Sequence, residues 1–186
     1  MNRLLITDLP LSGLKRITRQ PLGDARGFFS RLFCAEELTS AGWCKPMAQT
    51  NFSFTAQQGT VRGLHYQNPP DAEMKLISCK RGKIWDVAVD LRADSPTFLH
   101  WYAEILSADN HLALLIPEGF AHGFQTLTDN CELLYFNSAN YVPSSEGGLR
   151  SDDPILGIKW PIPVTLRSER DQEHPLLTTQ FSGINL

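Results

Sequence analysis

The run Arg62-Gly63-Leu64-His65-Tyr66-Gln67 carries the residues of this chain best suited to chemistry. It places a guanidinium and an imidazole three positions apart, and Lys75 follows ten residues after the histidine. An imidazole near its ordinary pKa removes a proton at neutral pH, and nearby cations stabilise the negative charge left behind. The pattern therefore predicts a histidine base with cationic support. The alternative is a strand-end histidine that is hydrogen-bonded for structure.

A second chemical segment spans residues 117–124 and contains the turn Pro117-Glu118-Gly119 followed by His122. A tight turn at this point would return the histidine into a neighbouring strand. His122 is therefore a candidate for the same pocket as His65. A buried structural histidine is the competing interpretation.

Strand-like runs separated by turn residues fill the middle of the sequence. We therefore expect strands to position the side chains of His65, Lys75 and His122. The runs cover residues 75–79, 83–91, 111–116 and 132–139, with Gly, Pro, Asn and Asp clusters between them. In residues 83–91 apolar and polar side chains alternate, which predicts a strand with one buried face. This spacing predicts a mainly β fold, an antiparallel jelly roll or barrel.

Side-chain parity gives more specific expectations for these strands. Successive side chains of a strand point to opposite faces, so Arg62 is expected on one face and His65 on the other. Tyr135 and Tyr141 are six residues apart and share a face if the strand runs unbroken.

Helix is predicted only near the two ends of the chain. Residues 35–41 read as a short helix that ends at Gly42. The last thirty or so residues are rich in proline and charge, and we expect loops and a short helix that wrap the barrel. Neither a repeat nor a linker interrupts the sequence, so residues 1–186 are predicted to form one domain.

Composition excludes several classes of function. The 186 residues are 42% hydrophobic and 20% charged, as in ordinary soluble proteins. A net charge of -3 and a pI near 5.9 argue against nucleic-acid binding. Neither a membrane-length apolar run nor a signal-peptide pattern is evident, so a cytoplasmic location is expected. The four cysteines lack the spacing of zinc or redox motifs and are predicted to be reduced structural thiols.

An ordered set of short motifs resembles the deoxythymidine-diphosphate (dTDP)-4-dehydrorhamnose 3,5-epimerase family. The motifs run from about residue 20 to residue 175 and are specific as a set rather than singly. They are Arg26-Gly27-Phe28-Phe29, Gln49-Thr50-Asn51-Phe52-Ser53, the run 61–67, Lys75-Leu76, the run 85–92, Ser95-Pro96-Thr97-Phe98, the run 117–124, Leu134-Tyr135, Asp153-Pro154, Trp160-Pro161 and Ser168-Glu169-Arg170-Asp171. The resemblance implies a cupin-type jelly roll, a nucleoside-diphosphate-sugar substrate and a homodimer.

The resemblance also implies roles for individual residues. His65 falls on the family's general base, Asp171 on the carboxylate that orients it, Tyr135 on the proton donor and Lys75 on the lysine near the C4 oxygen. The residues that fall on binding positions are Arg26, Gln49, Asn51, Arg62, His122, Tyr141, Glu146 and Arg170. Among these, Tyr141 would stack on the nucleotide base, and Arg170 replaces a lysine that the family often carries.

These residue types suit epimerisation next to a ketone. A neutral-pH base takes the weakly acidic hydrogen, a lysine stabilises the enolate oxygen, and a tyrosine returns a proton to the opposite face. The sequence therefore predicts an isomerase that needs neither a cofactor nor a metal. Packing of Tyr135, a turn role for Asp171 and solvation of Lys75 are the structural alternatives.

Three positions depart from the family pattern. Arg31 stands where an acidic residue is common, Phe136 where a lysine follows the tyrosine, and Ser151 where a tryptophan precedes Asp-Asp-Pro. Arg31 leaves open a different nucleotide or a different scope of reaction. The alternatives are a 3- or 5-mono-epimerase on a dTDP-, CDP- or GDP-linked 4-keto sugar.

Two further classes remain as alternatives. One is a non-enzymatic sugar-nucleotide-binding cupin, which the predicted base, acid and lysine disfavour. The other is a metal-dependent cupin dioxygenase. Tyr66 and Gln67 follow His65 in place of a His-x-His pair, and His100, His111 and His174 lie outside the motifs. The sequence thus predicts no three-ligand metal site.

Overall fold

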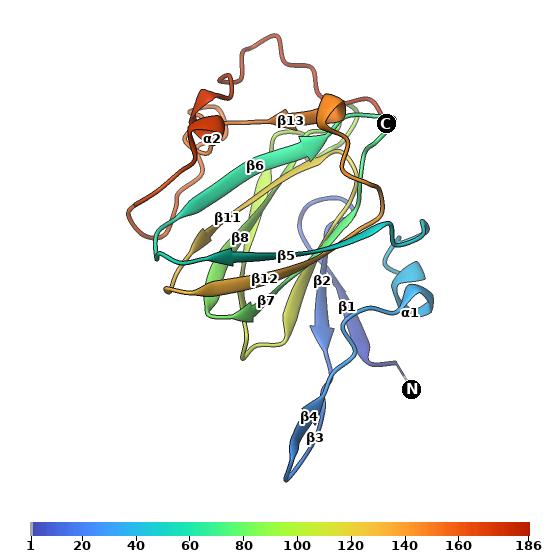
Figure 1. Cartoon of the computed structure of the whole chain (residues 1–186). Helices are drawn as coiled ribbons and strands as arrows, with labels where there is room; N and C mark the ends of the chain where they lie inside the picture. Colours follow the sequence, from blue (N-terminus) through green and yellow to red (C-terminus); the bar gives the residue numbers. More distant parts are fainter. Residues whose placement is uncertain (1) are drawn as a thin grey trace.

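The computed structural model describes residues 2–186 and consists mainly of two antiparallel β-sheets (Figure 1). The six-stranded sheet has the order β1 (Leu4–Asp8), β2 (Lys15–Arg19), β10 (Leu112–Ile116), β7 (Lys75–Arg81), β12 (Cys131–Asn137) and β5 (Gln49–Thr55). The five-stranded sheet has the order β13 (Glu146–Gly148), β6 (Val61–Gln67), β11 (Phe120–Thr126), β8 (Lys83–Asp90) and β9 (Trp101–Ser107). The predicted mainly β, antiparallel fold is confirmed.

The two sheets pack against each other through a shared apolar core. Ile77 and Leu133 of the six-stranded sheet join Ile84 and Phe124 of the five-stranded sheet in one cluster, and all four are at most 2% exposed. Burying a side chain of this size contributes about 1.5–3 kcal/mol. The core therefore holds the sheets at a fixed separation and leaves one end for a cavity.

The predicted strand runs all appear, with shifts of a few residues at their ends. They correspond to β7, β8, β10 and β12. The predicted turn at residues 117–119 is also confirmed, because it joins β10 to β11 and returns His122 into the five-stranded sheet.

Strand β8 differs from the prediction of one buried face, because both of its faces are buried. Val87 and Val89 pack beneath the C-terminal segment with Leu156, whereas Asp86 and Asp90 lie on the other face and are fully buried. Asp90 is satisfied by a cluster of donors, Arg92, Ser95 and Thr97. In β8 the alternation of polar and apolar residues therefore marks a polar face inside the protein and not a face exposed to solvent.

Strand β6 contains a bulge that overturns the parity expected for Arg62 and His65. His122 pairs with His65 and Phe124 pairs with Arg62, so three residues of β6 span the distance of two on β11. The extra residue reverses the alternation, and Arg62 and His65 line the same cavity. The expectation that they lie on opposite faces is wrong.

Gly63 makes this bulge possible. Its φ is +102°, and an added Cβ would lie 2.6 Å from the His122 carbonyl oxygen and 2.8 Å from the Gly123 Cα. Both the backbone conformation and the close approach of β11 therefore require glycine.

We expect Gly63→Ala to destabilise the protein more than Gly42→Ala. Gly42 has a similar φ of +96° but open space around an added Cβ, so its substitution costs about 1–2 kcal/mol through backbone strain alone. Gly63→Ala adds an overpacking cost of about 1–3 kcal/mol. Urea unfolding of both variants measures the difference. Equal loss of unfolding free energy would contradict the role given to the β11 contact.

Shorter elements lie at the two ends of the sandwich (Figure 1). The predicted early helix is α1 (Ala35–Thr39), and the predicted late one is α2 (Glu169–Glu173), which follows the 3-10 turn η1 (Pro143–Ser145) and the C-terminal loops. The hairpin of β3 (Leu22–Asp24) and β4 (Gly27–Phe29) projects away from both sheets. Helices long and apolar enough to cross a membrane are absent from residues 2–186. The four cysteines of the chain are free thiols.

Candidate active site

A cavity of about 290 Å³ lies between the two sheets and collects most of the predicted catalytic side chains. His65 of β6 and His122 of β11 reach it from the five-stranded sheet, whereas Lys75 of β7 and Tyr135 of β12 reach it from the six-stranded sheet. The other lining residues are Asn51, Arg62, Phe124, Asn137 and Arg170. The sandwich therefore brings acid–base groups to the cavity from opposite walls.

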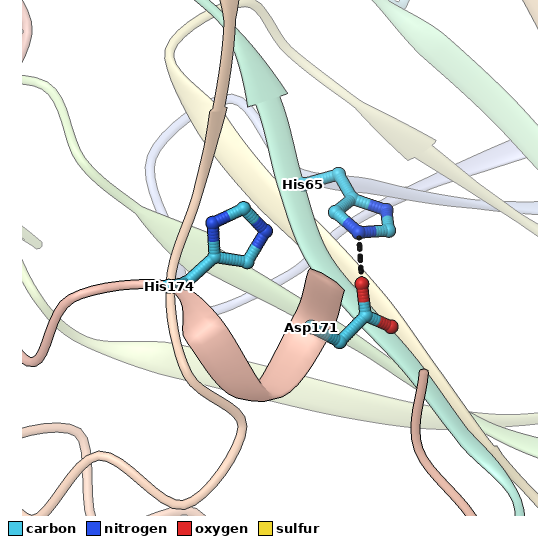
Figure 2. Close-up of side chains that lie close together, drawn as sticks. All are labelled: His65, Asp171 and His174. Atoms are coloured by element: carbon cyan, nitrogen blue, oxygen red, sulfur yellow. Dashed lines mark hydrogen bonds and ion pairs between the residues drawn. The ribbon is translucent and has the colours of Figure 1, made fainter. Parts of the chain in front are cut away.

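His65 is paired with Asp171, as the motif set predicted (Figure 2). The His65 Nε2 lies 2.7 Å from the Asp171 Oδ1, and the Gly63 N–H donates to the Asp171 Oδ2 at 3.1 Å. Asp171 lies on α2, whose first turn is capped by Ser168, and its carboxylate is almost completely buried. Helix α2 therefore holds a fixed carboxylate against the middle of β6.

This pairing determines the tautomer of His65. A carboxylate accepts hydrogen bonds and cannot donate them, so Nε2 carries the proton and Nδ1 is the free acceptor. The Arg170 guanidinium lies 3.2 Å from the same Nε2, but it is also a donor and acts there as a nearby charge. His65 thus offers a lone pair at Nδ1.

The environment keeps Asp171 ionised. Burial alone would raise the pKa of its carboxyl group, but the hydrogen bonds from His65 and from the Gly63 backbone outweigh that effect and lower the pKa below its ordinary value. An ionised Asp171 stabilises an imidazolium on His65 once that ring has taken a proton.

Tyr135 is held in its neutral form. Loss of solvent around the hydroxyl raises the pKa of Tyr135 well above its ordinary value, although the hydrogen bond to Ser53 at 3.3 Å opposes that shift. The ring packs edge-on to His122 with centroids 6.3 Å apart. At neutral pH Tyr135 therefore presents a proton to the cavity.

Lys75 lines this cavity and also a neighbouring one, which contains Tyr141. It has an acidic partner that the motifs did not indicate. Its Nζ is 3.1 Å from the Glu73 carboxylate, which also accepts a hydrogen bond from Asn137 at 2.6 Å. Glu73 precedes the first residue of β7, so side-chain parity within the strand gave no signal for it. The pair fixes the position of the Lys75 amino group in the cavity that it lines with His65 and Tyr135.

His122 forms a second histidine–aspartate pair, but a deeper one. Its Nε2 lies 2.8 Å from the Asp86 Oδ1, and the His122 side chain is 7% exposed, against 27% for His65. The more accessible ring, that of His65, is the better candidate for contact with a reacting group.

A neighbouring cavity of about 340 Å³ collects only part of the predicted binding set, whereas Arg62, His122 and Arg170 line the first cavity. Gln49, Tyr141 and Glu146 line it together with Lys75 and His65. Tyr141 is 51% exposed and donates from its hydroxyl to Glu146 at 2.8 Å, so one aromatic face remains available.

Glu146 connects Tyr141 to Arg170, whose guanidinium lies 3.2 Å from the same carboxylate.

The expectation that Tyr135 and Tyr141 share a strand face depended on an unbroken strand. Strand β12 ends at Asn137, so the two tyrosines do not share one strand face.

Arg26 is the one predicted binding residue that the fold does not bring to these cavities. It lies at the tip of the β3–β4 hairpin, where it pairs with Asp24 and its side chain is 90% exposed. Phe28 and Phe29 beside it are also exposed.

The three departures from the motif pattern lie outside the walls of both cavities. Arg31 forms an ion pair with Glu37 of α1, and Phe136 packs on Phe33 in the core with centroids 5.4 Å apart. Ser151 is buried, and its carbonyl accepts a hydrogen bond from Trp160.

His174 lies beside the His65–Asp171 pair, although the sequence placed it outside the motifs (Figure 2). The donor atoms of the three side chains lie within 4.8 Å of one another, a grouping that the motifs did not indicate, and the expectation of no metal site stays a prediction. The signal in the sequence was the Asp-x-x-His spacing of residues 171 and 174, which puts both on one side of a helical turn.

An antiparallel double-sheet jelly roll with a ligand cavity between its sheets is the cupin type of fold. The family model described as dTDP-4-dehydrorhamnose 3,5-epimerase matches residues 8–179. The chain belongs to the dTDP-4-dehydrorhamnose 3,5-epimerase family.

Individual relatives agree with this membership. A dTDP-4-dehydrorhamnose 3,5-epimerase of Sinorhizobium fredii is 40% identical over 178 residues, which is 95% of this chain and 91% of that protein. The crystal structure of a dTDP-6-deoxy-D-glucose-3,5-epimerase from Legionella pneumophila, in complex with dTDP-4-keto-L-rhamnose, is 36% identical. It superposes with a TM-score of 0.91 and covers 98% of each chain. A dTDP-4-dehydrorhamnose 3-epimerase of Streptomyces niveus is 36% identical over 170 residues, 91% of this chain and 82% of that protein.

Proposed function

We propose that this protein is an isomerase that inverts C3 and C5 of dTDP-4-dehydro-6-deoxy-D-glucose to give dTDP-4-dehydro-L-rhamnose. The observation that carries the proposal is the cavity that His65, paired with Asp171, enters from the five-stranded sheet and that Tyr135 and Lys75 enter from the six-stranded sheet. The family membership and the sugar nucleotide bound to the Legionella protein support the choice of substrate.

Proton abstraction is assigned to His65. Its Nδ1 takes the proton from the carbon next to the C4 ketone, and the electron pair of that C–H bond forms the C=C bond of the enolate as the π pair of the C=O bond moves to the C4 oxygen. Asp171 stabilises the resulting imidazolium. Lys75 supplies positive charge near the developing enolate.

Inversion requires a proton on the opposite face of the sugar. Tyr135 is suited to this step because it keeps its proton at neutral pH and comes from the facing sheet. A new C–H bond forms as the O–H bond breaks, and exchange with water then returns the phenolate and the imidazolium to their starting states. The reaction is neutral in redox terms, so it calls for no redox cofactor.

The nucleoside diphosphate is assigned to the cavity beside Tyr141. Tyr141 offers a flat face to the base there, and the two phosphates are assigned to the guanidinium forks of Arg62 and Arg170, which line the adjoining catalytic cavity. Gln49, Asn51, His122 and Glu146 are proposed to complete the binding set.

Arg26 fits this scheme only through a second copy of the chain. The β3–β4 hairpin carries it away from its own cavity together with two exposed phenylalanines, Phe28 and Phe29. We therefore assign the working unit as a homodimer in which the hairpin reaches the partner's site. We assign the enzyme to the cytoplasm because its proposed substrate is a charged metabolite. We assign its product to deoxysugar synthesis for cell-surface polysaccharides.

A product analysis tests the proposal. The enzyme is incubated with dTDP-4-dehydro-6-deoxy-D-glucose, the C4 ketone is reduced chemically, and the configuration at C3 and C5 is read by NMR coupling constants. Inversion at both carbons is expected. Recovery of unchanged substrate would contradict the proposal, and the CDP- and GDP-linked sugars tested alongside should react more slowly.

A 3-mono-epimerase is the second candidate, because the Streptomyces niveus relative of similar identity is named as one. The same product analysis separates the two candidates. Inversion at C3 alone would replace the leading proposal by this one.

Tyr141→Ala is expected to raise KM about 10-fold with little change in kcat, since base–aromatic stacking is worth about 1–3 kcal/mol and is made equally before and during reaction. Tyr141→Phe keeps the aromatic face and should keep KM near that of the wild type. Steady-state kinetics measure both variants. An unchanged KM in Tyr141→Ala would remove Tyr141 from the binding site.

A further inference from the structure

His174 has no part in the proposed reaction, yet its ring lies against the catalytic pair. It follows the last turn of α2, three residues after Asp171, and its ring centroid is 6.0 Å from that of His65 at an angle of 71°. Figure 2 shows the ring turning one nitrogen toward His65 and Asp171. The three side chains thus converge from β6 and from α2.

Their donor atoms form a compact set. One nitrogen of His65, one carboxylate oxygen of Asp171 and one nitrogen of His174 all lie within 4.8 Å of one another. Two imidazoles and a carboxylate are a donor set that Zn²⁺ and similar divalent transition metals favour.

The His174 Nε2 supplies an independent indication of a missing partner. This nitrogen is buried without a hydrogen-bond partner within residues 2–186. It packs so closely on Gly148 that an added Cβ there would lie 2.1 Å from it. A polar atom buried without a partner costs free energy, and a metal ion at this point would satisfy it.

We infer that His65, Asp171 and His174 form a site for a divalent transition metal, best filled by Zn²⁺, and that the bound metal blocks the base. Zinc binds nitrogen and carboxylate oxygen at about 2.0–2.2 Å, so tetrahedral ligands stand about 3.4 Å apart. His65 and Asp171, 2.7 Å apart as a hydrogen-bonded pair, must therefore separate slightly to admit the metal, and His174, whose donor nitrogen lies within 4.8 Å of both, must move closer at the end of α2.

Metal binding changes the chemistry of His65 directly. A metal on Nε2 displaces the proton that this nitrogen donates to Asp171, and the neutral imidazole then carries its proton on Nδ1. The lone pair needed for proton abstraction is thereby lost without any net release of protons. The block of turnover rests on the proposed function, whereas the metal site itself does not.

Arg170 sets the strength of this site. Its guanidinium lies 3.2 Å from the His65 Nε2 and opposes a second cation there, although its side chain is 56% exposed and is held by Glu146. Arg170 must turn outward when a metal enters. We therefore expect reversible binding, weaker than at structural zinc sites, that suits an inhibitory site.

The binding test uses the metal alone, because the diphosphate of the substrate itself chelates divalent ions. Chelator-treated protein is titrated with Zn²⁺ by calorimetry and with Co²⁺ by visible absorption, in the wild type, His174→Ala, His174→Gln and His100→Ala. His100 is an exposed histidine outside the cluster and serves as the matched control. The wild type and His100→Ala should bind one equivalent, and both His174 variants should bind about 10-fold more weakly or worse.

The activity test follows epimerisation at buffered free Zn²⁺. Inhibition should be reversed by a chelator, and the inhibitory concentration should rise about 10-fold in His174→Ala, whose rate without zinc stays near that of the wild type. Equal zinc affinity in the wild type and both His174 variants, or no stoichiometric binding to the wild type, would overturn the site. If zinc binding depends on His174 but zinc does not inhibit an active enzyme, the metal site stands and the proposed block of His65 is wrong.

Discussion

His65→Ala is expected to lower kcat by about 10²–10⁴-fold while leaving the fold intact, as is typical for loss of a general base. The side chain lies at the cavity wall with 27% of its surface exposed, so its removal takes little volume from the core. Asp171 keeps its hydrogen bond from the Gly63 N–H and its place on α2. Steady-state kinetics on the sugar nucleotide measure the loss.

Two controls make this result specific to the base. His100→Ala removes an exposed imidazole elsewhere and should leave kcat unchanged. Thermal unfolding of His65→Ala should stay within a few degrees of the wild type. A His65→Ala enzyme with near-normal turnover would show that His65 is not the base.

Tyr135→Phe is expected to slow net inversion by about 10²-fold or more, and to slow proton abstraction much less. The phenylalanine keeps the packing on His122 and deletes only the hydroxyl that contacts Ser53. The enolate should still form, the His65 imidazolium should exchange its new proton with heavy water, and a deuteron should then return to the carbon from the side on which the proton was lost. Deuterium from heavy water should therefore enter the substrate faster than epimerised product appears.

Tyr102→Phe is the matched control, because it also deletes a hydroxyl, one that donates to Glu104 on β9 away from the cavity. It should change neither rate. If exchange and inversion fall equally in Tyr135→Phe, Tyr135 acts before protonation and its assignment as the acid is incorrect.

The strands were predictable because turn residues and apolar runs are local signals. The bulge in β6 was not, since it arises where β11 approaches the backbone of Gly63. One extra residue was enough to move Arg62 to the face of His65. The buried Asp86 and Asp90 were missed for a similar reason, because alternation does not reveal which layers cover a strand.

Pairing within the site was predictable only through the motifs. His65 and Asp171 are 106 positions apart, and spacing alone cannot bring them together. Glu73, Ser53 and His174 were missed because their contacts with the catalytic side chains depend on the fold. The roles of the site residues and the organisation of the chain as one domain stay predictions.

Solvent-hydrogen exchange tests the central claim most directly. The protein is incubated in heavy water with dTDP-4-dehydro-6-deoxy-D-glucose, and deuterium at C3 and C5 is counted by NMR and mass spectrometry, with His65→Ala in parallel. We expect one deuterium at each carbon with the wild type, and incorporation slowed by about 10²-fold or more with His65→Ala. Absence of deuterium with the wild type, or the same incorporation with both proteins, would contradict the claim.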